Sequence, residues 1–168
     1  DALYNILKEK YPNEVTRYHS RIKPERRKKQ LLFDFLQGKR KIMIATSAFS
    51  MGIDVPDIEL VVHFNAPISM TDYIQQIGRA GRDGRKAHCV LFYDQNGDDE
   101  AISNSFIKKA KKQSPKAAKV IKAKLSQVHD FIHSDSCMVC DILEYQGQHE
   151  RKTCKRCTVC AQKRRNSK

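Results

Sequence analysis

Short apolar runs rich in β-branched residues alternate with amphipathic segments along the first part of the chain, and this alternation constrains the fold more than any other feature. Strands are expected at residues 15–19, 41–46, 60–64 and 88–93, with helical segments before and between them. Pro24 is expected to open one helix that Gly38 closes, and Ser114 and Pro115 are expected to open another further along the chain. Helices and strands that alternate through short connections form a parallel α/β sheet with helices on both faces. The uninterrupted run at 60–64 is typical of a strand that is buried on both faces.

The order of elements opens on a helix, at residues 2–10, rather than on a strand. We therefore expect the first strand of the sheet, and a domain before it, to lie upstream of this sequence. The starting residues Asp1-Ala2-Leu3-Tyr4 have neither an initiator methionine nor the basic and apolar segments of a signal peptide. No apolar run approaches the roughly 18 residues that a membrane span needs, so we expect an intracellular protein without a membrane partner.

Charge divides the chain into two parts. Residues 1–100 carry 16 Lys and Arg against 14 Asp and Glu, a net of +2, whereas residues 101–168 carry 16 against 5, a net of +11. A concentration of positive charge is typical of a module that meets a polyanion. We therefore predict a main domain at 1–100, a basic helical subdomain at 101–162 and a disordered basic tail at 163–168.

The segment Gln-Gln-Ile-Gly-Arg-Ala-Gly-Arg-Asp-Gly at 75–84 predicts the end of a helix, capped at its start by Thr71, that faces an anion. Gln75, Arg79 and Arg82 are spaced i, i+4 and i+7, so a continuous helix would place them on one face. Each glycine costs about 1 kcal/mol within a helix, and that cost favours close approach of a ligand or another backbone. Two guanidinium groups suit a chain of phosphates. The alternative interpretation of these arginines is a solvated helix face with surface ion pairs.

A polar loop at residues 46–56 follows the second predicted strand. Ligands of open α/β sheets bind at the carboxyl ends of strands, so this loop is a candidate site. The hydroxyls of Thr46 and Ser47 suit phosphate oxygens, and the carboxylate of Asp54 suits ribose hydroxyls. A tight turn with a capping aspartate is the alternative interpretation.

Cys89 lies alone, and the other five cysteines crowd into residues 137–160. In an intracellular protein such clustering favours a metal over disulfides. Two sets of four thiolates would satisfy tetrahedral zinc. The first set has the spacing of a zinc ribbon and the second exchanges one member: Cys137, Cys140, Cys154 and Cys157, or Cys137, Cys154, Cys157 and Cys160.

Several of these strings together resemble the second RecA-like domain of the RecQ-family DNA helicases, within superfamily 2. The strings are Thr46–Asp54, Val61–Met70 and Gln75–Gly84, with Tyr18–Ser20 and Leu91–Asp94 in support. The cysteine cluster that follows them distinguishes RecQ within the superfamily. The resemblance covers nearly the whole chain and implies a RecA-like parallel sheet, truncated at its N-terminal side, followed by a small helical zinc-binding subdomain.

The resemblance also implies roles for individual residues. Gln75, Arg79 and Arg82 match family residues that reach ATP held by the first RecA-like domain, and Asp54 matches the residue that contacts the ribose. Arg79 and Arg82 match the catalytic arginines. The second of these resembles an arginine finger, which is typically worth about 10³–10⁵ in rate.

Thr46 and Ser47 match a family loop that contacts the DNA backbone, and His19 matches a nucleic-acid-binding motif less closely. Among the cysteines, the family pattern selects a structural Zn²⁺ site without Cys140, formed by Cys137, Cys154, Cys157 and Cys160. The sequence departs from the family at Gln146 and Gln148, where phenylalanine and glutamate are usual.

The resemblance therefore implies an ATP-dependent DNA helicase of repair and recombination that acts on single-stranded or forked DNA, in the cytoplasm and nucleoid of a bacterium or the nucleus of a eukaryote. The sequence contains neither a Gly-x-x-x-x-Gly-Lys-[Ser/Thr] loop nor an Asp-Glu-x-His strand for Mg²⁺. ATP and Mg²⁺ would be shared with a first RecA-like domain, so this chain alone is expected to hydrolyse no ATP. Two alternatives stay open: a stand-alone nucleic-acid-binding zinc module without motor activity, and a scaffolding piece whose zinc region binds a protein.

Overall fold

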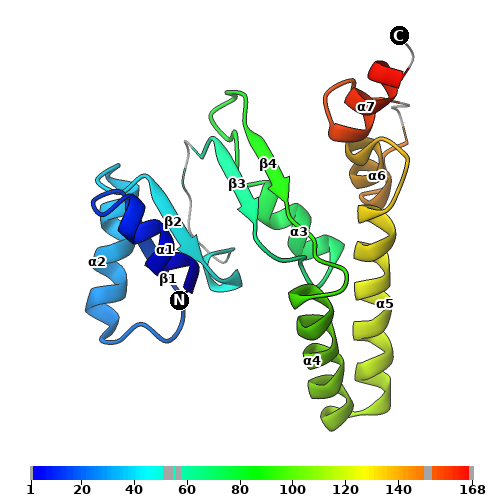
Figure 1. The fold of residues 1–168 in the computed structure, drawn as a ribbon. Coiled ribbons are helices and arrows are strands. Elements are labelled where there is room, and N and C mark those ends of the chain that lie inside the picture. Colours follow the sequence, from blue (N-terminus) through cyan, green and yellow to red (C-terminus); the bar gives the residue numbers. More distant parts are fainter. Residues whose placement is uncertain (1, 51–54, 56–57, 150–152, 167–168) are drawn as a thin grey trace. The chain divides into compact units, whose positions relative to one another are not determined.

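The computed structural model describes residues 2–50, 55, 58–149 and 153–166. The chain forms two compact units, Asp1–Asp57 and Ile58–Lys168, and each contains a parallel sheet of two strands (Figure 1). The predicted alternation of helices and strands is therefore present in both units, although the strands form two small sheets.

In the first unit, two parallel strands pair along their full length. Its elements follow in the order α1 (Ala2–Lys10), β1 (Val15–Tyr18), α2 (Glu25–Leu36), β2 (Ile42–Ala45) and the 3-10 helix η1 (Ser47–Ser50). The register pairs Val15 with Ile42 and Tyr18 with Ala45. Val15 and Thr16 are buried, so the start of β1 forms the centre of this unit.

Helix α2 begins and ends where the sequence predicts. Pro24 precedes the first helical residue, where its fixed φ and missing amide proton are tolerated. Gly38 adopts a φ of 68° just after the helix, and its amide donates to the carbonyl of Phe35 at 2.9 Å. A left-handed residue after a helix is usually glycine because it has no Cβ to clash.

The second unit contains one parallel strand pair and five helices among its described residues. Its elements are β3 (Leu60–His63), α3 (Met70–Ile77), β4 (His88–Leu91), α4 (Asp98–Gln113), α5 (Pro115–Ile132), α6 (Met138–Tyr145) and α7 (Thr158–Asn166). The buried carboxylate of Asp99, in the first turn of α4, accepts hydrogen bonds from the backbone amides of Ala66 at 2.7 Å and Asp94 at 2.8 Å. These bonds fasten the segments that follow β3 and β4 to the start of α4.

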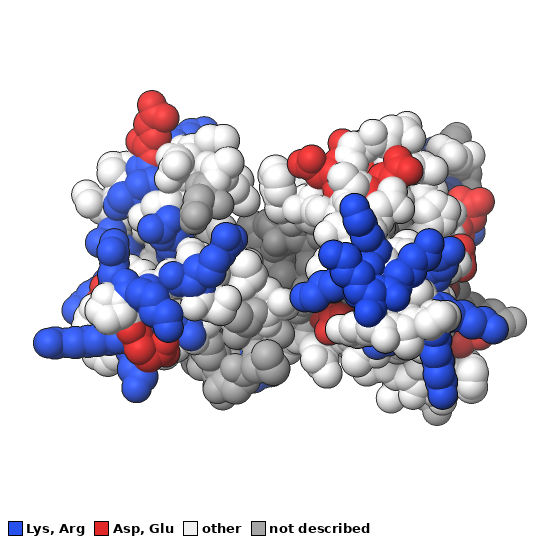
Figure 2. Space-filling view, turned by 90° about the horizontal axis from the view of Figure 1, so that it is seen from below, with Lys and Arg blue, Asp and Glu red and all other residues white. Residues whose placement is uncertain are grey.

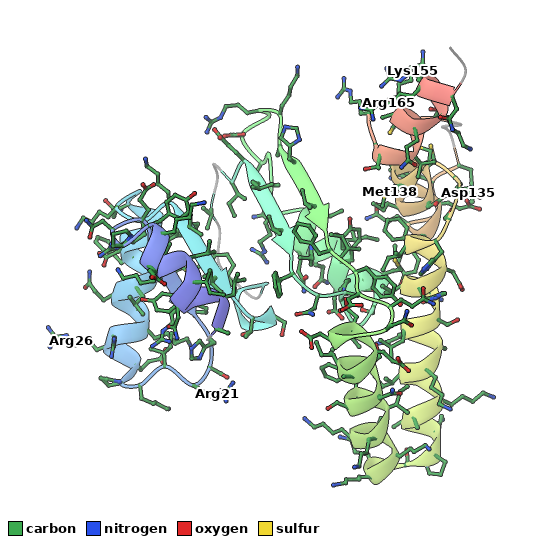
Figure 3. All side chains as sticks on the ribbon, viewed as in Figure 1. Arg21, Arg26, Asp135, Met138, Lys155 and Arg165 are labelled. Carbon is green, nitrogen blue, oxygen red and sulfur yellow. The ribbon has the colours of Figure 1, made fainter. Side chains whose placement is uncertain are left out.

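One hydrophobic core joins α3 to α5. Met70 and Tyr73 of α3 pack with Val128 and Phe131 of α5. Met138 at the start of α6, which Figure 3 labels, packs against them. Helix α3, which carries Gln75, thus shares a core with α5 and α6, the helices before and after Cys137. The domain boundary predicted at residue 100 falls inside the second compact unit, Ile58–Lys168.

Helices α4 and α5 run antiparallel as a hairpin (Figure 1), joined by Ser114 alone. As predicted, Ser114 caps α5, because its hydroxyl accepts a hydrogen bond from the amide of Ala117 at 3.0 Å, and Pro115 is the first helical residue. Ala110 and Ala118, one from each helix, are both buried. Their small side chains allow the two backbones to come close.

Expectations about the burial of β3 and the order of the C-terminal tail differ from the structure. The run at 60–64 was expected to be buried on both faces, yet Leu60, Val62 and Phe64 are 55%, 47% and 56% exposed while His63 is buried. In a sheet of two strands, the side chains of β3 have fewer neighbours to bury them than in the wide sheet that the sequence predicted. A disordered tail was expected at 163–168, but α7 continues to Asn166, with cations in its last turn where the helix dipole favours them.

Candidate functional site

Helix α3 presents Gln75 on its exposed side. The helix is capped by Ser69 rather than by Thr71, because the Ser69 hydroxyl oxygen accepts from the amide of Asp72 at 3.1 Å. Ser69 lies at the position with extended backbone before the first turn, which is where a capping hydroxyl is effective. Thr71 instead lies inside the helix, and its hydroxyl is 3.0 Å from that of Tyr145 on α6.

The two arginines lie in a turn after α3, so the predicted continuous helical face is wrong. The helix ends at Ile77 with Gly78 as its C-cap, and Arg79 and Arg82 follow in irregular backbone. Arg82 folds back, and its Nε donates to the carbonyl oxygen of Gly78 at 3.1 Å. Both arginines follow the helix within five residues of its end, and a cation is favourable at the exposed carbonyls of a helix end.

Backbone contacts hold this turn to the start of the second unit. Ala80 forms a parallel bridge with Ile58, and the amide of Gly81 donates to the Ile58 carbonyl at 3.0 Å. Gly81 has a φ of 68°, and a Cβ there would lie 3.0 Å from the carbonyl oxygen of Arg85. The glycine is therefore required both by the backbone conformation and by the close approach of the chain.

Arg85, which the sequence analysis did not single out, organises the far side of the turn. Its amide and its Nε donate to the two carboxylate oxygens of Asp83, at 3.0 Å and 2.6 Å, and its guanidinium reaches Glu59 at 3.4 Å. The hydrogen bonds from the Arg85 backbone and side chain hold the pKa of Asp83 below its usual value. The Asp-x-Arg spacing is a sequence signal that could have indicated this Asx-type turn.

A partly buried hydrogen bond of Gln76, the residue after Gln75, ties α3 to β3. Nε2 of His63 lies 2.7 Å from Oε1 of Gln76, and the His63 ring stacks at a tilt on Tyr73 with centroids 5.1 Å apart. Burial lowers the pKa of His63, and the hydrogen bond to Gln76 opposes that shift only in part. His63 is thus favoured as the neutral imidazole.

In the first unit, the predicted nucleic-acid residues lie at one edge of the sheet. Thr46 follows β2, His19 follows β1, and the amide of Thr46 donates to the carbonyl of Tyr18 at 3.2 Å. Ser47 opens η1, and both Thr46 and Ser47 are exposed. Asp54 lies outside the described residues. The structure therefore brings His19 close to the Thr46 loop, as expected for the carboxyl ends of adjacent parallel strands.

Next to His19, cationic side chains surround a pocket of about 280 Å³. Its lining is formed by Arg17, His19, Arg21, Ile22, Lys23, Arg27 and Leu31. Burial, and then the charges of Arg17 and Arg21, lower the pKa of His19. The surroundings favour an anion there.

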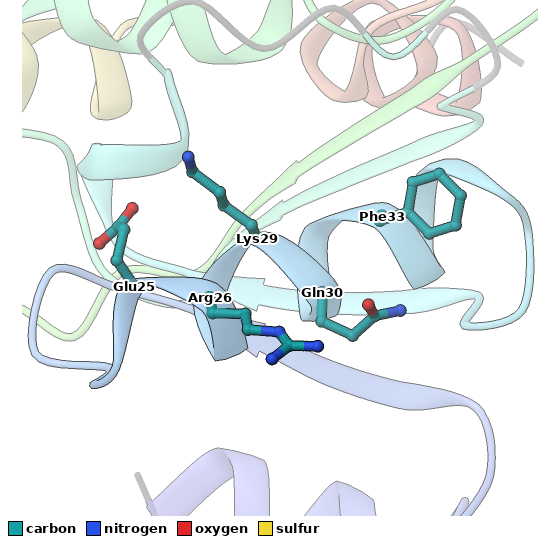
Figure 4. A pocket seen from close by; sticks show the side chains of 5 residues that line it. All are labelled: Glu25, Arg26, Lys29, Gln30 and Phe33. Atoms are coloured by element: carbon teal, nitrogen blue, oxygen red, sulfur yellow. The ribbon is translucent and has the colours of Figure 1, made fainter.

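A larger hollow of about 490 Å³ lies on α2 and contains none of the predicted site residues. It is lined by Glu25, Arg26, Lys29, Gln30 and Phe33 (Figure 4).

Four cysteine sulfurs converge at the end of the second unit. They lie within 4.8 Å of one another and belong to Cys137, Cys154, Cys157 and Cys160. Cys137 is the N-cap of α6, and Cys160 lies in α7, so the cluster joins the two helices. Cys140 is one turn further along α6 and is not in the cluster that the described residues form. This is the arrangement of the RecQ resemblance rather than that of the zinc ribbon.

The spacing and the hydrogen bonds of the cluster suit thiolates around a metal. Sulfur pairs lie 3.9 Å apart for Cys157 and Cys137 and 4.0 Å apart for Cys154 and Cys160. Four sulfurs at about 2.3 Å from a tetrahedral Zn²⁺ would be about 3.8 Å apart. The amide of Cys154 donates to the Cys137 sulfur at 3.1 Å. Burial raises the pKa of Cys137, but hydrogen bonds from Cys140 and Cys154 lower it to about 6.

Comparison with known proteins identifies the two parts of the chain. Residues 1–84 match the helicase conserved C-terminal domain, and residues 97–161 match the RecQ zinc-binding region. The chain belongs to the RecQ family of helicases. The RecQ-type zinc region explains why the sulfur cluster follows a helicase domain, and it confirms the resemblance that the sequence strings indicated.

Among relatives, the ATP-dependent DNA helicase RecQ of Bacillus subtilis is 36% identical over 166 residues, covering 98% of this chain and 27% of that protein. The putative ATP-dependent RNA helicase R290 of Acanthamoeba polyphaga mimivirus is 36% identical over 143 residues, covering 85% of this chain and 25% of that protein. This RecQ-family chain thus spans about a quarter of these relatives' length.

A solved structure of S. cerevisiae Dbp5 bound to RNA and ADP BeF3 has a similar fold. Its TM-score is 0.50 at 25% sequence identity, over 74% of this chain and 35% of that chain. The likeness confirms a RecA-like helicase domain with parallel strands. No helix among the described residues of the RecQ-family chain is long and apolar enough to cross a lipid bilayer.

Proposed function

We propose that this chain is the second motor domain and the zinc-binding region of an ATP-dependent DNA helicase. The observation that carries the proposal is the turn after α3, which contains Arg79 and Arg82 and is anchored by the bonds of Gly81 to Ile58 and of Arg82 to Gly78. Permanently charged guanidiniums held on a rigid turn suit the phosphates of a nucleotide. Two observations favour DNA over RNA as the nucleic acid. The chain carries a RecQ zinc-binding region, and the Bacillus subtilis relative that matches 98% of this chain is named a DNA helicase.

In this proposal, ATP and Mg²⁺ are held by a first RecA-like domain and completed by this chain. Gln75 and Arg79 bind the nucleotide, and Asp54 contacts its ribose. Arg82 stabilises the charge that develops on the transferring γ-phosphoryl group. A guanidinium that acts only when the cleft closes stabilises the transition state more than the ground state, so its effect falls on turnover.

Thr46, Ser47 and His19 contact the nucleic-acid backbone on the first unit. The cationic pocket beside His19 supports that assignment, because it offers an environment that attracts phosphate. Binding dominated by phosphate contacts is independent of base sequence and weakens as salt rises.

Zn²⁺ is bound by Cys137, Cys154, Cys157 and Cys160 as a structural ion. Four thiolates leave no open coordination position, so the ion supplies folding energy rather than a reactive water. It holds α6 and α7 together next to the core that contains α3.

The test is Arg82→Ala in the intact helicase, with Lys86→Ala as a control that removes a nearby exposed cation. We expect Arg82→Ala to reduce ATP turnover by about 10³-fold or more while DNA affinity stays within about twofold. Lys86→Ala should leave both unchanged. Loss of DNA affinity in proportion to turnover would show that Arg82 is a DNA ligand.

A second measurement addresses the alternative of a zinc module without motor activity. The 168-residue chain by itself is expected to bind DNA but to hydrolyse no ATP, because it carries only one side of the nucleotide site. Its addition to the separate first RecA-like domain should raise that domain's DNA-dependent turnover. Turnover that does not respond to the added chain would favour the stand-alone module.

A further inference from the structure

The free end of the α4–α5 hairpin is strongly basic. Between Glu100 and Asp130 the chain contains eight lysines and no acidic residue. Six of the lysines lie in the last two turns of α4 and the first turns of α5, and we refer to them as the lysine tip: Lys108, Lys109, Lys111, Lys112, Lys116 and Lys119. All six are exposed, and a cluster of blue side chains marks this end of the second unit in Figure 2.

The charge of the lysine tip is not neutralised by the fold. In the part of the second unit that the structure describes, ion pairs join Arg85 to Asp83 and Glu59 and His129 to Asp130, and no ion pair involves a lysine of the tip. Lys116 lies in the first turn of α5, where the helix dipole favours acidic residues, and no acidic residue occupies that turn. Clustered like charges destabilise the hairpin by repulsion, and a bound polyanion would relieve that repulsion.

The hairpin also holds its charges in a fixed arrangement. The Ser114 cap and the buried alanines, Ala110 and Ala118, fix the two helices at the tip. At the other end, Val128 and Phe131 pack α5 against α3. Lysines on two rigid neighbouring helices can face two rows of phosphate at once, since packed helices lie about 8–10 Å apart and the major groove of B-DNA is about 12 Å wide.

The chemistry of the tip favours duplex over unpaired strands. No aromatic residue occurs between Lys108 and Lys124, so the tip offers no ring on which an unpaired base can stack. Proteins that bind single strands combine positive charge with such aromatic platforms. Lysine alone recognises phosphate without reading bases.

We propose that the lysine tip binds the phosphate backbones of duplex DNA. This contact involves none of the motif residues His19, Thr46 and Ser47, which belong to the first unit. It extends the DNA binding of the proposed function, but it requires neither nucleotide nor the arginines of the turn after α3.

The test measures binding of the zinc-loaded 168-residue chain, without nucleotide, to a blunt duplex of mixed sequence by fluorescence anisotropy. The tip variant is Lys111→Gln, Lys112→Gln and Lys116→Gln together. The control variant, Lys10→Gln, Lys39→Gln and Lys86→Gln, removes the same charge from exposed lysines elsewhere. Glutamine keeps the helix propensity and most of the length of lysine, and circular dichroism with zinc analysis checks that each variant folds.

The tip variant should lose on the order of 10²-fold in duplex affinity at about 0.1 M salt, and the slope of log K against log salt should fall by about 2 to 3. The control should lose far less. An equal loss in both variants would overturn the proposal, because it would show only an effect of net charge. A loss for a single-stranded oligonucleotide as large as that for the duplex would overturn the assignment of duplex as the ligand.

The result is independent of the ATP assignment. Failure of the lysine tip would leave the Arg82→Ala prediction untouched, and normal turnover in Arg82→Ala would leave the duplex measurement untouched.

Discussion

The ring of Tyr73 on α3 lies on the ring of Phe131 on α5, with centroids 5.4 Å apart and planes tilted by 52°. This contact joins the helix that carries Gln75 to the helix that leads to the cysteine cluster. On its other side Tyr73 contacts His63, whose partner is Gln76. Helix α3, whose Gln75 the proposed function assigns to the nucleotide, thus packs against α5 of the zinc-binding region, and the two parts are expected to lose structure together.

Phe131→Ala is expected to lower the free energy of unfolding of the second unit by about 3–5 kcal/mol, because it opens a cavity against Tyr73. Val120→Ala is the matched control on the same helix, since Val120 is 48% exposed, and it should change stability by less than about 0.5 kcal/mol. Urea unfolding of the zinc-loaded chain measures both. Equal effects of the two substitutions would contradict a core centred on this ring pair.

Gly81→Ala should disturb the arginine turn more than Gly84→Ala. Both glycines have positive φ, 68° and 81°, so both substitutions cost roughly 1–2 kcal/mol of backbone strain. Only at Gly81 would the new Cβ also lie 3.0 Å from the carbonyl of Arg85 and 3.3 Å from Cβ of Ala87. Thermal unfolding and, in the intact helicase, ATP turnover compare the two variants. Indistinguishable variants would show that the close approach has no energetic weight.

Cys160→Ser should lower bound zinc well below one ion per chain, whereas Cys140→Ser should leave about one, because only Cys160 belongs to the sulfur cluster. Metal analysis after gel filtration measures the content, and unfolding in the presence of a strong chelator measures its role in folding. The reverse pattern would favour the zinc-ribbon set. Full stability of the chelated wild-type chain would contradict a structural ion.

Stability should depend on pH through His63. Its folded-state pKa is lowered from 6.5 by burial, so the unfolded chain binds a proton at a pH where the folded chain does not. The stability that neutral His63 contributes is therefore present above about pH 6.5 and is lost as pH falls towards the folded-state pKa. His63→Gln should flatten this slope, while the exposed His88→Gln should keep it. Chemical unfolding between about pH 7.5 and 5.5, with zinc content checked at each pH, measures the difference.

Local signals in the sequence determined most of the elements. Pro24, Gly38 and the Ser114-Pro115 pair bound their helices as expected, because capping and the φ preferences of glycine and proline act within a few residues. The strand runs were placed to within two residues for the same reason. The motif strings were also sufficient to indicate the family, because they depend on residue type and spacing.

From helical periodicity, the sequence predicted that Gln75, Arg79 and Arg82 share one face of a continuous helix. The tertiary structure contains no such face, because the helix ends before the two arginines. Gly78 ends α3, and the Ile58 bridge draws the following residues into a turn. Helical periodicity describes an uninterrupted helix and carries no information about a segment elsewhere in the chain, such as that at Ile58, that competes for the same backbone groups.

Both cysteine sets have a spacing that suits zinc, so spacing does not distinguish them. Which sulfurs come together depends on how α6 and α7 are placed, and only the tertiary structure shows that. The same holds for the contact of Tyr73 with Phe131, which joins residues 58 positions apart. Residue type and spacing determine helix caps, strand positions and motifs within a few residues, so these features can be predicted from the sequence. Contacts between distant segments depend on packing that the chain acquires only when its helices meet around a common core.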